Sequence, residues 1–167
     1  MGEIEKLGRN SPTGHTLYFL AVSDPGEIPD ISLCSPNFCV LLLWDVTNLE
    51  PAKLVSVGRK LITAGGTYFC CWGPECETLH DAIDHAAPEF DDDETVIMTT
   101  WHSDEVLEDA IWFFLNSAFP HETFEETTKS MLAICVNNRE WASKCRQALA
   151  NSSEFSKNWL ERDESAV

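Results

Sequence analysis

Short apolar segments rich in β-branched and aromatic residues alternate along the chain with longer segments of helical periodicity, and this alternation constrains the fold more than any other feature. The short segments are typical of buried strands, and the longer ones of helices with one apolar side. We expect strands at residues 16–23, 38–45, 67–72, 95–100 and 131–136. From the second strand onward a helix follows each strand, and these helices are expected at residues 47–64, 74–87, 103–119 and 137–150.

Such an alternation predicts a parallel sheet with right-handed crossovers and helices on both faces. The expected fold class is therefore α/β, with a three-layer, Rossmann-like sandwich around a mostly parallel sheet of five strands. The first strand is followed by a Pro-rich loop at residues 24–37 and not by a helix. It is our candidate for an antiparallel strand at the edge of the sheet.

Local signals predict where the helices start. Thr47 and Glu50 form a capping-box pattern before the first helix, and Pro74 suits the first helical position of the second. Ser103 is expected to cap the third helix, and Asn137 to start the fourth.

The length of 167 residues fits one domain with a core of its own. We expect a flexible segment at residues 1–15, a single α/β domain at 16–150, and a polar tail at 151–167 with one helical turn around Trp159. The longest apolar run, residues 38–44, is far shorter than the roughly 20 residues that cross a bilayer. Because the first segment also lacks the apolar core of a secretory signal, the expected location is the cytoplasm, without a membrane partner.

The cysteines support the same location. The chain has seven of them, an odd number, and several lie within the strand-like runs. Free cysteine behaves as a small buried hydrophobe, so we expect reduced core thiols in a reducing compartment.

Charge is distributed unevenly along the chain. The formal net charge is −17, and residues 61–128 contain no Lys or Arg but 16 Asp and Glu. Such a surface repels the phosphates of nucleic acid, so we expect no nucleic-acid partner. It attracts a basic protein surface or divalent cations, and the alternative is that the charge only maintains solubility.

The residues that follow the expected parallel strands form the candidate site. In open α/β sheets, ligands bind at the carboxyl ends of these strands. Aromatic, thiol, imidazole, amide and carboxylate groups gather there, namely Asp45, Trp72, Glu75, Cys76, Trp101, His102, Asp104, Glu105 and Asn137.

Two segments at this edge resemble a family of small uncharacterised bacterial proteins. They are the WGPECE string at residues 72–77, with His80 and Asp81 after it, and the TTWHSDE string at residues 99–105, with WFFLN after it. The resemblance covers roughly residues 41–149. It implies a compact Rossmann-like domain and carries no activity or mechanism.

Cys76 and His102 are the candidate catalytic residues. Cys76 is expected in the first turn of a helix, where the dipole and free amides favour the thiolate that nucleophilic catalysis requires. Glu75 and Glu77 would instead raise the pKa of this thiol, and the alternative role for Cys76 is helix packing.

Two metal sites are conceivable from the spacing. Cys71, Cys76, His80 and His85 loosely suggest Zn²⁺, and Cys76 and His80 would share a helix face. Four carboxylates at the sheet edge would suit Mg²⁺, although acids at helix starts are also explained by the helix dipole: Asp45, Glu75, Asp104 and Glu105. No Gly-rich phosphate loop is present, and we expect no resident cofactor, with Mg²⁺ or Zn²⁺ as the alternatives.

These observations favour an acidic cytoplasmic protein-binding module, such as an immunity or inhibitor protein that covers a basic partner. The alternative is a small metal- or thiol-dependent hydrolase whose site lies at the carboxyl edge of the sheet. A third hypothesis is a scaffold or homodimer that uses exposed aromatic residues among Trp44, Trp72, Trp101, Trp112, Trp141 and Trp159.

Overall fold

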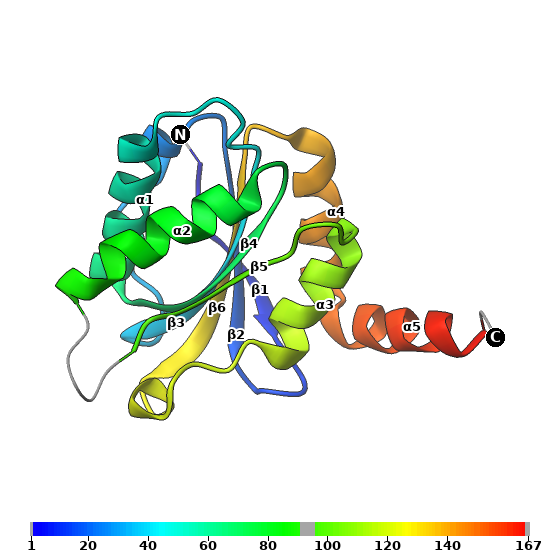
Figure 1. Ribbon diagram of the computed structural model, residues 1–167. Helices are drawn as coiled ribbons and strands as arrows, with labels where there is room; N and C mark the ends of the chain where they lie inside the picture. The colour runs from blue at the N-terminus through cyan, green and yellow to red at the C-terminus, as the bar shows by residue number, and fades with distance from the viewer. Residues whose placement is uncertain (1, 91–95, 166–167) are drawn as a thin grey trace.

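A sheet of six strands forms the middle layer of the computed structural model, which describes residues 2–90 and 96–165 (Figure 1). The strands are β1 (Glu5–Arg9), β2 (Thr16–Val22), β3 (Asn37–Trp44), β4 (Gly66–Trp72), β5 (Met98–Trp101) and β6 (Thr128–Val136). They lie in the order β1-β2-β6-β3-β4-β5, with β1 antiparallel to β2 and every other pair of neighbours parallel. The expected α/β fold with a mostly parallel sheet is therefore confirmed.

The strand that the sequence pattern missed is β1, which pairs with β2 at one edge of the sheet. Its sequence holds one large apolar residue, Leu7, so periodicity carries no strand signal there. The sheet consequently has six strands and not five, and residues 5–9, expected within a flexible segment, form the antiparallel edge strand. The segment expected at that place, β2, is parallel to its other neighbour, β6. Thr95, the first residue of the expected 95–100 strand, lies outside the described residues.

Helices α1 (Pro51–Ala64) and α2 (Cys76–Ala86) cover one face of the sheet, and α3 (Leu107–Ser117) and α4 (Arg139–Ala150) cover the other (Figure 1). Each helix follows a parallel strand, as the alternation predicts. None of the helices in the described part of the chain is long and apolar enough to cross a membrane.

The two faces of β3 supply both halves of the core. Val40 and Leu42 pack into the cluster under α1 and α2, and Leu41 and Leu43 pack into the cluster under α3 and α4. All four side chains are fully buried. A central strand covered on both faces has no polar side, which explains why its sequence is an unbroken apolar run.

The starts of α1 and α2 differ from the local signals. α1 has Glu50 as its N-cap without a side-chain hydrogen bond, so the expected capping box does not form. α2 starts at Cys76, and Pro74 lies in the turn before it. Glu75 in that turn has a left-handed backbone, with φ of 60°. The chain must reverse sharply from β4 into α2, and capping patterns do not contain that tertiary requirement.

The starts of α3 and α4 also shift. α3 starts at Leu107, so Ser103 precedes the helix and does not cap it. Asp104, expected in the first helical turn, is a left-handed loop residue with φ of 60°. The N-cap of α4 is Asn138, whose side chain accepts a hydrogen bond from the backbone N–H of Trp141 at 2.9 Å.

The C-terminal residues form a longer helix than expected. α5 (Ser152–Ser165) has 14 residues, whereas the polar composition indicated a single turn. It packs on α3, where Trp159 Nε1 donates to Asp109 Oδ1 at 2.8 Å and Asn116 Nδ2 donates to Ser156 Oγ at 3.0 Å. Beyond these contacts the helix projects away from the body of the molecule (Figure 1).

Candidate functional site

The carboxyl ends of the parallel strands lie along one edge of the sheet, in the order β2, β6, β3, β4 and β5. The chain leaves β3 for α1 on one face and leaves β6 for α4 on the other, so the adjacent ends of β3 and β6 form the switch point at which open α/β sheets bind ligands. A cavity of about 330 Å³ lies here, and Asp45, Lys53, Asn137 and Trp141 are among the residues that line it. Of the binding residues predicted from sequence, Asp45 and Asn137 are therefore brought together.

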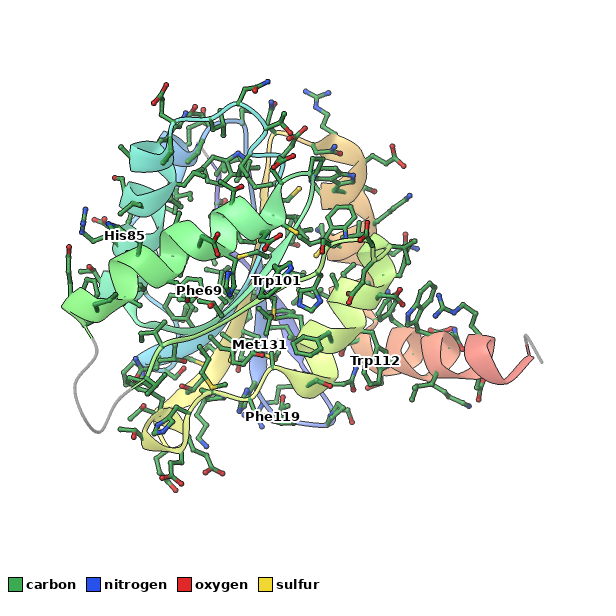
Figure 2. The ribbon with its side chains drawn as sticks, viewed as in Figure 1. Phe69, His85, Trp101, Trp112, Phe119 and Met131 are labelled. Carbon is green, nitrogen blue, oxygen red and sulfur yellow. The ribbon has the colours of Figure 1, made fainter. Side chains whose placement is uncertain are left out.

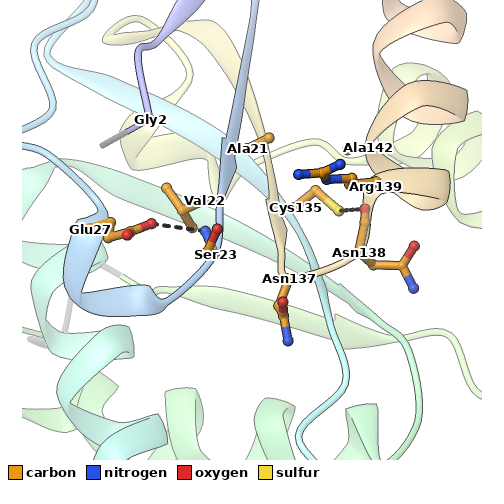
Figure 3. A pocket seen from close by; sticks show the side chains of 10 residues that line it. All are labelled: Gly2, Ala21, Val22, Ser23, Glu27, Cys135, Asn137, Asn138, Arg139 and Ala142. Carbon is orange, nitrogen blue, oxygen red and sulfur yellow. Dashed lines mark hydrogen bonds between the residues drawn. The ribbon is translucent and has the colours of Figure 1, made fainter.

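A second hollow of about 500 Å³ lies beside this cavity, between the ends of β2 and β6 (Figure 3). Ser23, Asn137 and Asn138 line both hollows, and Arg139 lines the second. Asn137 adopts φ of 55°, a conformation that asparagine tolerates better than most residues. Sequence reasoning missed Lys53 and Arg139. Both lie in the first turn of a helix, and a basic residue there does not indicate a binding site until the neighbouring strand ends are known.

Asp45 sits at the tip of β3 and its carboxylate is exposed. Its Oδ1 accepts a hydrogen bond from the backbone N–H of Thr47 at 3.0 Å. The turn after β4 packs tightly against the end of β3. A Cβ on Gly73 in this turn would lie 2.4 Å from the carbonyl oxygen of Trp44, and Gly73 has φ of 130°. The turns after β3 and β4 are therefore held in close contact, and glycine is required at this position.

Trp72 bridges two parts of the edge. Its Nε1 donates to the backbone oxygen of Glu105 at 2.9 Å, which ties the end of β4 to the loop after β5. Its ring also meets Trp141 of α4 edge to face, with centroids 4.9 Å apart. Trp72 is thus a structural link across the rim, and the aromatic pair separates the switch point from the β5 end.

His102 is buried and held from two sides. Its Nδ1 lies 2.9 Å from Glu105 Oε2, and its Nε2 lies 3.1 Å from Thr100 Oγ1. The ring packs against Phe113 of α3, with centroids 4.7 Å apart. Only 5% of the residue is exposed, so the imidazole is positioned within the fold and presents little surface to a substrate.

Cys76 is 1% exposed and packs in the core cluster beneath α1 and α2. Burial raises the pKa of its thiol, although backbone hydrogen bonds, among them one from His102, act in the other direction. Both ring nitrogens of His102 have the partners Thr100 and Glu105, so it is the backbone of His102 that meets Cys76. The geometry favours a protonated packing thiol over a thiolate activated by this imidazole.

The residues considered as metal ligands have other partners. His80 Nδ1 lies 3.1 Å from Asp81 Oδ1, and His80 Nε2 lies 3.4 Å from Asp84 Oδ2. Cys71 is fully buried, and His85 is exposed at the last turn of α2. Across residues 2–90 and 96–165, no three His, Cys, Asp or Glu side chains are grouped so that they could hold a metal ion. Neither the proposed Zn²⁺ set nor the proposed Mg²⁺ set gathers.

The comparison with protein families places the chain in one family. Residues 17–152 match the model of a family described as a domain of unknown function, DUF7684. The chain belongs to this family. The DUF7684 match contains the whole of residues 41–149, so the resemblance to an uncharacterised family is confirmed. No curated protein and no solved structure matches the chain.

This DUF7684 chain exposes large apolar side chains mostly in one part of its sequence. Those that are exposed are Val96, Met98, Trp101, Val106, Phe119 and Leu160. All except Leu160 belong to residues 61–128, the stretch without Lys or Arg. Trp101, 45% exposed, lies on β5 (Figure 2). The centroid of its ring is 4.5 Å from that of His80 on α2. Trp101 was predicted from the sequence as a residue of the candidate site, and its exposure follows from the position of β5 at the edge of the sheet.

Proposed function

We propose that this DUF7684 protein is an acidic protein-binding module that covers a basic surface of a partner protein, in the manner of an immunity or inhibitor protein. The proposal rests on a shared location: most of the exposed apolar side chains belong to the acidic stretch without Lys or Arg, which we call the acidic half. Protein interfaces combine an apolar centre with a charged rim, and this half offers both.

The charge of this half extends beyond single residues. It comprises β4, α2, β5 and α3, and all 11 Lys and Arg residues of the chain lie outside it. Cations from outside this half pair with two of its acids, Arg59 with Glu89 and Arg162 with Asp109. Here the exposed carboxylates of Glu77, Asp81 and Asp104 create a negative field that accelerates encounter with a cationic protein.

The alternative of a thiol-dependent hydrolase has less support. Cys76 is buried with a raised pKa, and His102 is buried between two partners. We also propose the cytoplasm as the working compartment, because all seven cysteines are free and six of them are buried.

A selection from a displayed library of random dodecapeptides at low salt tests the proposal. Peptides rich in Lys and Arg are expected to be enriched, with affinities that fall as salt rises. Glu77→Gln, Asp81→Asn and Asp104→Asn combined remove three charges from the acidic half. We expect about tenfold weaker binding, from roughly 0.5 kcal/mol per rim charge.

The matched control removes three exposed acids from the other half, by combining Glu3→Gln, Asp30→Asn and Glu154→Gln. Because its net charge changes equally, it should bind within twofold of the original protein. Enrichment of peptides without cationic character, or equal weakening by the two triple variants, would show that the acidic half is not a binding surface.

A further inference from the structure

We infer that the partner docks by adding an extended cationic segment to the open edge of β5, as a further strand of the sheet. This inference rests on the proposed function and specifies how the partner binds. β5 is the last strand of the sheet, and no strand of the described residues pairs with its outer side. Exposed edges bind extended peptides through backbone hydrogen bonds.

The direction of the backbone groups follows from one hydrogen bond. The N–H of His102 donates to the oxygen of Cys71 on β4 at 3.0 Å. The direction of the backbone N–H and C=O groups alternates from one residue to the next along a strand. The backbone groups of Thr100 and Met98 therefore also point toward β4, with which both residues are paired. The N–H and C=O groups of Thr99 and Trp101 therefore face the open side and are the ones that an added strand would bind.

The opposite edge of the sheet is protected, and β5 is not. β1 carries the exposed cations Lys6 and Arg9 and has a register shift between Lys6 and Gly8. Charges and bulges of this kind prevent unwanted pairing. β5 has no charged residue between Met98 and Trp101, and it pairs with β4 without a register shift. The difference marks β5 as the edge left free to pair.

Both faces of β5 offer apolar contacts to an added strand. Trp101 lies on the α2 side, where its ring meets His80. Met98 is paired with Tyr68, whose side chain belongs to the cluster on the α3 side, and Met98 is 37% exposed. An added strand that places side chains alternately on the two faces would bury Trp101 and Met98 together.

Charge selects the occupant. Asp84 flanks the edge on the α2 side, where it accepts a hydrogen bond from Thr99, and Asp104 and Glu105 follow β5 in the chain, all three exposed. A second copy of this chain would bring the same carboxylates together, which disfavours a homodimer through β5. In a segment in which Lys or Arg alternates with apolar residues, the apolar side chains can pack on Trp101 and Met98 and the cations can pair with these carboxylates.

Amide hydrogen exchange measured by NMR tests the docking mode directly. The probe is the tightest cationic peptide from the library, added to the complete protein. The amides of Thr99 and Trp101 should exchange at least tenfold more slowly with the peptide bound, because their N–H groups become hydrogen-bonded.

A pair of substitutions isolates the backbone contribution. Thr99→Pro removes an outward N–H that the pairing with β4 does not use, and it should weaken peptide binding at least tenfold. Thr99→Val keeps that N–H and should bind within twofold, which controls for loss of the hydroxyl that donates to Asp84. Should Thr99→Pro fail to fold, the exchange measurement on the unaltered protein still decides.

The outcomes separate this inference from the proposed function. Peptide binding that depends on the acidic half but leaves Thr99 and Trp101 unprotected would overturn strand addition and leave the proposed function standing. Protection of the same amides by self-association without peptide would identify a second copy as the occupant and overturn the inference. Failure to select any cationic peptide would overturn both.

Discussion

At the scale of single residues, the cysteines of this protein differ sharply in environment. Cys34 is exposed, and hydrogen bonds from Ser130, Thr16 and Tyr18 lower the pKa of its thiol to about 7. Its Sγ lies 3.2 Å from Ser130 Oγ. Burial instead raises the pKa of Cys76 and of the other core thiols, for which the protonated form is favoured.

Cys34 is therefore expected to be the reactive thiol. At its pKa of about 7 half of the thiol is ionised, so its rate of reaction with an aromatic disulfide reagent should rise through a midpoint near that pH and then level off. Ser130→Ala removes the strongest stabilising hydrogen bond and should move the midpoint of the rate profile to higher pH. A midpoint near 9 in the unaltered protein, or equal labelling of the buried thiols, would contradict this prediction.

His102 is expected to contribute to stability. His102→Ala removes the hydrogen bonds to Thr100 and Glu105 and opens a cavity against Phe113, which should lower the free energy of unfolding by about 2–3 kcal/mol. Urea denaturation followed by circular dichroism measures this change. Val106→Ala, at a nearby residue that is 53% exposed, is the control and should change stability by less than about 0.5 kcal/mol. Equal stability of the two variants would contradict the structural role.

At the scale of elements, α5 shows how a polar segment is recruited by tertiary contacts. Its composition has little apolar surface, and isolated short helices are marginal in water. Trp159 supplies the missing stabilisation, because it binds Asp109 of α3 and carries Arg162 over its ring at 3.4 Å.

Trp159→Ala should loosen α5 and lower the free energy of unfolding by about 1–2 kcal/mol. Leu160→Ala, at the neighbouring residue that is 53% exposed, should have an effect below about 0.5 kcal/mol. Limited proteolysis provides a second measurement, since cleavage within α5 should be faster for Trp159→Ala alone. Similar cleavage rates for the two variants would indicate that the helix does not depend on this contact.

At the scale of the whole molecule, charge opposes the compact state. A net charge of −17 on 167 residues repels itself, and much of the excess is concentrated around β4, α2, β5 and α3. Repulsion among these exposed carboxylates should therefore reduce stability at low salt.

Addition of about 0.2 M NaCl should raise the free energy of unfolding by roughly 1–2 kcal/mol, because salt screens repulsion between exposed charges. Urea is the suitable denaturant for this measurement since it adds no ions. The triple variant Glu77→Gln, Asp81→Asn, Asp104→Asn should gain less from salt. A stability that is unchanged or falls with salt would contradict net repulsion.

The site was predictable only in part. The residues after each strand could be named from the sequence, and Asp45 and Asn137 do meet at the switch point. For Cys76 the sequence offered both a catalytic and a packing role, and its burial favours packing. The burial of His102 could not be inferred, because a residue just after a strand can face either the solvent or a neighbouring element. Trp101 was named from the sequence as a site residue, and the structure places it on the exposed edge strand β5.

Local periodicity determined the strands β2 to β6, the helices between them and hence the α/β class, because the spacing of apolar residues within one segment is enough to indicate a strand or a helix. The tertiary structure alone decided that β1 joins the sheet, that β6 inserts between β2 and β3, and that β5 remains at the open edge. Strand neighbours depend on pairing between residues far apart in the chain, and no local pattern specifies such pairing. The acidic half with its free edge is therefore a product of topology acting on a charge distribution already present in the sequence.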